Sequence, residues 1–234
     1  MEVLVVGNTA YVDDDFCAKA FPGDHVQVVA ADDAHRDESS SHGSWKELLR
    51  HLDQAYEFDR VVYLSTYLTP HTETFGDIEL LRSVFRACMG HRVQLLFVAG
   101  PAGAEGTDGA ANAADVPDAA FAAPIQTGKG IIARAANDLC RYYASQDGIQ
   151  AKILCTPYLY TASTALNDPF LVPLFEACST GAVALQGAAD APLPLLCAEE
   201  LAVLVHRIFD SWDATFETLD VADAFHRTAG DLGE

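Results

Sequence analysis

The sequence predicts an α/β protein built on a doubly wound parallel sheet with helices on both faces. Three observations predict this class. Short runs of apolar, often β-branched residues recur along the chain, and turn-forming residues bound each run. Amphipathic stretches of helical length separate these runs. The first run, Val3–Val6, stops at Gly7, and a strand–turn–helix–strand unit of about 30 residues opens the chain.

The predicted elements alternate along the chain. Strands are predicted at Val3–Val6, Val26–Val29, Arg60–Ser65, Val93–Val98, Ala151–Leu154 and Glu217–Val221. Helices are predicted at Asp13–Phe21, Trp45–Ala55, Asp77–Cys88, Gly128–Ser145, Pro169–Ser179 and Glu199–Trp212. Strands that are apolar throughout, without alternating polar residues, are typical of a parallel sheet that is covered on both faces. Residues 31–43 and 99–124 are predicted as loops, and loops as long as the second are usually functional or disordered.

Two parts of one compact unit are expected from this order. Residues 1–160 are predicted to form a Rossmann-like core, and residues 161–234 a reduced C-terminal portion packed on the same domain.

Composition excludes several classes of function. The chain has 34 acidic residues against 14 Lys and Arg, a formal net charge of −20, so binding to nucleic acid is not expected. Its apolar runs stop well short of the ~20 residues that a membrane span needs, and a cytoplasmic location is predicted. The six cysteines form no CxxC pair and have no histidine at metal-ligand spacing, which argues against a metal site or a disulfide framework.

The turn after the first strand reads Gly7-Asn8-Thr9-Ala10-Tyr11-Val12-Asp13. A glycine at the start of such a turn lets the backbone approach a pyrophosphate, which binds at the N-terminus of the following helix. Here Asp13, Asp14 and Asp15 bring carboxylates to that helix end. They are interpreted either as caps that complement the helix dipole or as groups that repel a diphosphate, and both interpretations weaken the diphosphate site.

Several ordered motifs resemble the extended short-chain dehydrogenase/reductase family, the NAD-dependent epimerases and dehydratases of nucleotide sugars. The resemblance spans nearly the whole chain. Its motifs are the glycine turn of Met1–Tyr11, the helix motif Phe75–Leu81, Lys129 at the start of a helix of the family's length, the strand and turn Ile153–Tyr160, and the later turn Leu196–Ala202. The glycine turn departs from the family pattern, because Ala10 and Asp13 occupy the positions of the second and third glycines of that pattern.

The resemblance implies a site for NAD or NADP at the carboxyl ends of the strands. Asp32 is its candidate for the ribose hydroxyls, and Lys129 its ribose-binding lysine. The full set of cofactor-binding residues that the resemblance implies is Gly7, Thr9, Ala10, Tyr11, Val12, Asp32, Leu64, Ser65, Lys129, Pro157 and Tyr160.

The family's catalytic groups are missing at the matching positions. That chemistry uses a tyrosine that moves a proton, a lysine four residues later, and a serine or threonine that bonds the substrate oxygen. The tyrosine position is Ile125, which has no proton to transfer, and the hydroxyl position falls within Ala99–Pro101. No catalytic residue is therefore assigned to this chain.

The sequence leads to one preferred function and two alternatives. The preferred one is a non-catalytic regulatory or scaffold module that binds a nucleotide or another small ligand and acts on a fused or associated partner, the chain being a piece of a longer protein. One alternative is an active epimerase, dehydratase or reductase in which Tyr160 or an aspartate of residues 99–124 supplies the proton. The other is a homodimerisation module that binds no ligand.

Overall fold

The computed structural model describes residues 1–7, 11–30, 53, 57–64, 76–99, 128–145, 149–156, 158–161 and 195–221. These residues form two sheets and four helices. The strands are β1 (Glu2–Gly7), β2 (His25–Ala30), β3 (Arg60–Leu64), β4 (Val93–Ala99), β5 (Ile149–Cys155), β6 (Tyr158–Tyr160), β7 (Leu195–Cys197) and β8 (Phe216–Asp220). The helices are α1 (Asp14–Ala20), α3 (Gly76–Cys88), α5 (Gly128–Ala144) and α7 (Ala198–Asp210).

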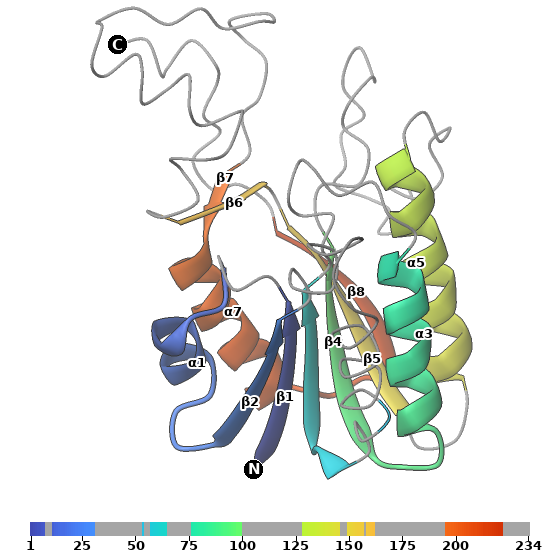
Figure 1. The fold of residues 1–234 in the computed structure, drawn as a ribbon, viewed down its shortest axis with the longest axis horizontal. Coiled ribbons are helices and arrows are strands. Elements are labelled where there is room, and N and C mark those ends of the chain that lie inside the picture. The colour runs from blue at the N-terminus through green and yellow to red at the C-terminus, as the bar shows by residue number, and fades with distance from the viewer. Residues whose placement is uncertain are drawn as a thin grey trace, which may run out of the picture.

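The main sheet has six parallel strands in the order β2-β1-β3-β4-β5-β8 (Figure 1). After β1 the chain forms β2 on one side of it, and then forms β3 on the other side. The direction in which strands are added thus reverses at β1. In open sheets of this kind, ligands bind outside the carboxyl ends of the strands at such a reversal. The fold class predicted from the sequence is confirmed.

Two apolar layers hold helices against the sheet. Because side chains alternate along a strand, Leu4 and Val6 of β1 face one layer and Val3 and Val5 face the other. The first layer lies under α3 and α5, and the second under α1 and α7 (Figure 1). All four of these β1 side chains are fully buried, as the uninterrupted apolar run predicts for a strand covered on both faces.

Most of the predicted elements agree with the structure where it describes them, with two exceptions. Asp53, within the predicted helix 45–55, lies in a turn, and Ala99, within the predicted loop 99–124, ends β4. Six predicted strands and four predicted helices are present within the described residues, with ends shifted by a few residues at most. The short parallel pair β6·β7 was not predicted as a sheet, because each strand has only three residues. The loop at 31–43, the helix at 169–179, nearly all of the helix at 45–55 and of the loop at 99–124 lie outside the described residues. The division at residue 160 stays a prediction.

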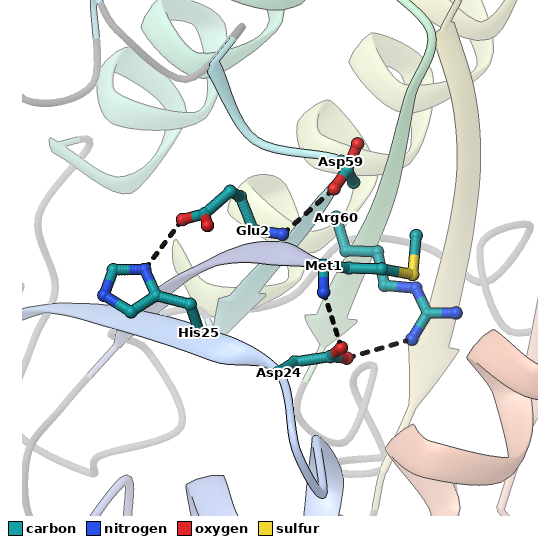
Figure 2. Close-up of polar contacts among 6 residues, drawn as sticks. All are labelled: Met1, Glu2, Asp24, His25, Asp59 and Arg60. Atoms are coloured by element: carbon teal, nitrogen blue, oxygen red, sulfur yellow. Dashed lines mark hydrogen bonds and ion pairs between the residues drawn. The ribbon is translucent and has the colours of Figure 1, made fainter.

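The amino-terminal edge of the sheet is held by polar contacts (Figure 2). The Met1 ammonium lies 2.8 Å from Asp24 Oδ1, and Arg60 Nη1 lies 3.6 Å from Asp24 Oδ2. The Glu2 backbone N–H donates to Asp59 Oδ2 at 2.9 Å. These contacts join the beginnings of β1, β2 and β3. They lie at the opposite end of the sheet from the carboxyl ends of β1 and β3, which we call the reversal site because the strand order reverses there.

A buried lysine joins β5 to β8. The side chain of Lys152 is only 4 % exposed, and its Nζ lies 2.6 Å from Glu217 Oε2 and 3.2 Å from Asp213 Oδ1. The ammonium also lies 5.2 Å from the ring centroid of Trp212. Lys152 and Glu217 are direct partners in the register of the two strands. The buried lysine side chain therefore pairs with two exposed carboxylates and lies against an aromatic face.

Among the described helices, none is long and apolar enough to cross a membrane.

Candidate functional site

The site implied by the fold lies at the carboxyl ends of β1 and β3. Gly7 ends β1 and Leu64 ends β3, and the two strands are direct neighbours. Five of the predicted cofactor-binding residues lie outside the described residues: Thr9, Ala10, Asp32, Ser65 and Pro157. Lys129 is in the first turn of α5, but the described atoms do not include its side chain. Gly7, Tyr11, Val12, Leu64 and Tyr160 are described, and whether any of them binds a cofactor stays a prediction.

Gly7 is fixed by the close approach of β3. A Cβ added at Gly7 would lie 2.9 Å from Leu64 Cβ and 3.4 Å from Val12 Cγ2. The first distance is too short for two carbon atoms, so any larger residue would push the strand ends apart. The packing of the two strand ends alone explains the glycine at this position.

The side chains of Tyr11 and Val12 belong to the apolar core. Each is only 3 % exposed, and both belong to the layer beneath α1 and α7. A ligand at the carboxyl edge would therefore meet the backbone of this segment. The sequence motif predicted the position of the turn, whereas the burial of its side chains follows from their packing.

Asp13 caps helix α1. Its backbone is extended, and its Oδ1 accepts a hydrogen bond from the Phe16 backbone N–H at 2.8 Å. This is the usual N-cap arrangement, in which a side-chain oxygen satisfies a free N–H of the first turn. The capping interpretation of Asp13 is confirmed. The second interpretation, repulsion of a diphosphate, is compatible with this geometry because the carboxylate stays at the helix end.

The surroundings of this helix end are acidic. Asp13, Asp14 and Asp15 are all exposed. Burial raises the pKa of the nearby Cys17 thiol, and the charges of Asp14 and Asp13 raise that pKa further. The negative potential of the two carboxylates therefore reaches a half-buried group one turn into the helix.

The end of β4 carries no hydroxyl group. Its last residue, Ala99, is fully buried, and its carbonyl oxygen accepts two hydrogen bonds from Thr156. The Thr156 backbone N–H donates at 2.8 Å and its Oγ1 at 2.9 Å. Sequence reasoning missed this clamp, since a threonine after a strand has no distinctive signature. Thr156 supplies a hydroxyl near the strand ends, but that hydroxyl is 57 residues from Ala99 in sequence and binds its backbone.

Tyr160 lies in the small β6·β7 sheet. It is half-buried and is the register partner of Cys197, which occupies the N-cap position of helix α7. Leu159 and Leu196 of the same pair are buried in the layer beneath α1 and α7. In Figure 1 this sheet lies beyond the carboxyl end of the main sheet, on the side of α7. Tyr160 is therefore carried by an element next to the predicted ligand edge.

Within the described ranges, no group of three or more His, Cys, Asp or Glu side chains could hold a metal ion. The cysteines described there are all free thiols. Burial raises the pKa of both Cys88 and Cys155 to about 12, with the charge of Asp220 adding to the effect at Cys155. These thiols remain protonated at neutral pH and behave as small apolar side chains.

Comparison with solved structures identifies proteins that share this fold. UDP-glucuronic acid 4-epimerase from Bacillus cereus, in complex with UDP-glucuronic acid and NAD, aligns with a TM-score of 0.71 at 14% identity over 99% of this chain and 80% of that one. The chain has the fold of nucleotide-sugar epimerases. UDP-N-acetylglucosamine 4-epimerase from the same organism aligns with a TM-score of 0.65 at 15% identity, over 100% of this chain and 81% of that one.

A third similar structure is the Bordetella bronchiseptica enzyme WbmF in complex with NAD+ and UDP. It has a TM-score of 0.68 and 15% identity, and the alignment covers 99% of this chain and 75% of WbmF. No protein-family model and no curated protein matches the sequence. The likeness is thus one of fold, and the resemblance in fold expected from the ordered motifs is confirmed.

Proposed function

We propose that this chain is a ligand-binding module of the epimerase fold that takes a nucleotide-type ligand without catalysing the epimerase reaction. Its role is regulatory or structural, in a longer protein or with an associated partner. The observation that carries the binding proposal is the reversal of strand order at β1, with Gly7 and Leu64 packed together at the carboxyl edge. The similar structures with bound NAD support a ligand at this edge.

The described residues fit only part of an NAD molecule. Gly7 has no Cβ, so the ends of β1 and β3 pack closely, and a dinucleotide site at this edge needs such a close approach of the backbone. The helix that would face the diphosphate, however, has its N-terminus capped by the carboxylate of Asp13. No step of a mechanism is therefore drawn through NAD.

The proposal that the chain is not catalytic is based on the residues at the positions of the family's tyrosine and of its serine or threonine. A proton donor or acceptor must lie within hydrogen-bond reach of the reacting atom. Ala99 at the end of β4 has no hydroxyl group, and its carbonyl is already bonded twice by Thr156. Ile125 replaces the family tyrosine in sequence. What the chain retains can position a ligand but supplies no acid or base at these two positions.

The proposal is tested by pairing a binding measurement with a turnover measurement. Isothermal titration calorimetry with adenosine, NAD and UDP-glucose should show binding of at least one ligand. An assay of NADH formation and of sugar epimerisation, with UDP-glucose and NAD present, should show no turnover above that of the buffer. Turnover that disappears in Lys129→Ala would overturn the non-catalytic role.

An active enzyme is the alternative that the position of Tyr160 favours, since β6 lies next to the ligand edge. Its test is Tyr160→Phe, which removes only the phenolic hydroxyl. If the wild-type protein turns over and this variant does not, Tyr160 supplies the proton and the chain is an enzyme. A protein that binds none of the three ligands is instead the homodimerisation module, which sedimentation analysis would identify by its mass.

A further inference from the structure

The second half of helix α3 forms a basic surface on an acidic chain. Residues 80–104 contain neither Asp nor Glu, and they are the longest such stretch in a chain with 34 acidic residues. Within this stretch Arg82, Arg86 and Met89 are exposed and recur at the spacing of one helix face. We call these three residues the arginine stripe. It runs toward the beginning of β4, and so away from the reversal site (Figure 1).

The arginines of the stripe have no carboxylate partner in the described part of the chain. The basic side chains that form ion pairs with carboxylates there are Lys19, Arg60 and Lys152. Arg82 and Arg86 form none, although Glu79 lies one turn before Arg82 on the same helix. Two guanidinium groups therefore remain available to carboxylates from outside the described residues.

The stability of the helix accounts for only one of the two arginines. A cation in the last turn complements the helix dipole, and Arg86 is in the last turn of α3. Arg82 lies one turn earlier, where this effect has fallen off. Like charges four residues apart on a helix also destabilise it, so the second arginine works against the helix that carries it.

Exposed apolar side chains lie on the same layer of the molecule. Met89 is 47 % exposed and Tyr142 of α5 is 59 % exposed. The Tyr142 ring meets the Tyr143 ring edge-on at 5.1 Å, and Tyr143 stacks on Phe85 of α3 at 4.8 Å. The exposed tyrosine is thus joined through one ring to the residue that precedes Arg86. Arginine, methionine and tyrosine are the residue types that protein–protein interfaces favour.

We propose that the arginine stripe, with Tyr142 at its border, is the docking surface for an acidic segment of a partner protein. Carboxylates of that segment pair with Arg82 and Arg86, because the planar guanidinium group binds a carboxylate through two parallel hydrogen bonds. Apolar side chains of the segment cover Met89. This surface is separate from the ligand edge, and it adds a binding site to the proposed function.

The charge of the stripe decides between this partner and other occupants. A symmetric dimer through the stripe would place its arginines against their own copies, since a twofold axis brings the same patch together. Nucleic acid and anionic membranes are extended polyanions that a chain of net charge −20 repels. A short acidic segment meets only the acid-free stretch, because charges farther away than about 8 Å are screened at physiological ionic strength.

Fluorescence anisotropy at low salt tests the proposal with the full chain. The probe is a fluorescein-labelled peptide of Glu-Glu-Leu-Leu repeats, and the control probe has Gln in place of Glu. The proteins are the wild type, Arg86→Gln, Arg82→Gln/Arg86→Gln and the matched control Arg207→Gln. Arg207 is also an exposed arginine in the last turn of a helix, but it belongs to α7 on the other face of the sheet.

The wild type should bind the Glu peptide and bind the Gln peptide about tenfold more weakly or less. Arg86→Gln should weaken binding of the Glu peptide about tenfold, and the double variant should weaken it further. Arg207→Gln should change it by less than about twofold. Unchanged melting temperatures would show that the variants fold. Binding of adenosine, NAD and UDP-glucose should be the same in the double variant and the wild type, which separates this surface from the ligand edge.

Three results overturn the inference. The first is a wild type that binds the Glu peptide no more tightly than the Gln peptide. The second is an Arg207→Gln protein that loses as much affinity as Arg86→Gln, because net charge and not the stripe then governs binding. The third is sedimentation of the wild type as an oligomer that the double variant does not form, because the occupant of the stripe is then a second copy of this chain.

Discussion

Lys152 allows an asymmetric test of how this fold tolerates a buried charge. Removing the lysine leaves Glu217 and Asp213, whose side chains are 39 % and 83 % exposed and can return to water. Removing both carboxylates instead leaves Lys152, whose side chain as a whole is 4 % exposed, without a counter-charge. We expect the second change to cost far more stability than the first, because an uncompensated buried charge carries the full desolvation penalty.

The magnitudes follow from these exposures. Lys152→Met keeps an unbranched chain against Trp212 and should lower the free energy of unfolding by about 1 kcal/mol or less. Asp213→Ala/Glu217→Met should lower it by about 3 kcal/mol or more. The triple variant that combines all three substitutions should return to within about 1 kcal/mol of Lys152→Met, since it holds no buried charge.

Urea unfolding followed by circular dichroism measures these differences at constant m-value. As a control, Glu199→Met breaks the exposed contact with Lys19 and should leave the urea midpoint nearly unchanged. Net charge alone would predict that the double variant is the more stable protein, because removing acids from a chain of net charge −20 reduces self-repulsion. Equal losses in Lys152→Met and the double variant would refute the reasoning.

The pH dependence of the same cluster has a defined sign. Burial lowers the pKa of Lys152, but hydrogen bonds to Glu217 and Asp213 and their charges outweigh this, so its pKa is raised above the ordinary value of 10.5. A raised pKa in the folded state contributes stability that is fully present below the unfolded pKa. This contribution should be lost as pH rises above about 10.5 through the folded pKa. The free energy of unfolding of the wild type and of Lys152→Met is measured with urea at pH 9 and at pH 11. The difference between the two proteins should be smaller at pH 11 than at pH 9.

The remaining predictions concern the ligand edge and the cysteines. Gly7→Ala should destabilise the protein by about 1–3 kcal/mol, since its Cβ would lie 2.9 Å from Leu64 Cβ, and an unchanged urea midpoint would contradict this packing. Thr156→Val should cost about 1 kcal/mol in urea unfolding through loss of the hydroxyl bond to Ala99, whereas Thr156→Ser, which can keep that bond, should cost less. In the native protein, a thiol reagent at pH 8 should not modify Cys88, Cys140 or Cys155, whose pKa values burial raises above the ordinary range; rapid labelling of any of them would show that the core opens.

Much of the fold follows from sequence pattern alone. The uninterrupted apolar runs of β1 and β3 predicted strands buried on both faces, because only a doubly covered parallel sheet removes both sides of a strand from water. The helices α3, α5 and α7 were predicted from the 3.6-residue spacing of their apolar residues, which lets one stripe face the sheet. The negatively charged start of α1 was also evident from three successive aspartates.

Other features depend on contacts that no local pattern contains. The pairing of β5 with β8 and the ion pair of Lys152 with Asp213 each join segments some 60 residues apart. The clamp between Thr156 and the Ala99 carbonyl likewise forms only when two strand ends meet. The contacts of a lysine within a predicted strand, or of a threonine after it, cannot be predicted until the partner segments are known.

The sequence by itself determined the class of the fold, the position of the glycine turn and the absence of the family's tyrosine and hydroxyl groups, because these are local choices of residue type. Only the tertiary structure decided that Gly7 is required by Leu64, and that Thr156 bonds the Ala99 carbonyl. The physical reason is that steric exclusion and hydrogen bonding depend on distances of a few ångströms. Those distances are set when strands and helices pack, and no spacing along the chain specifies them.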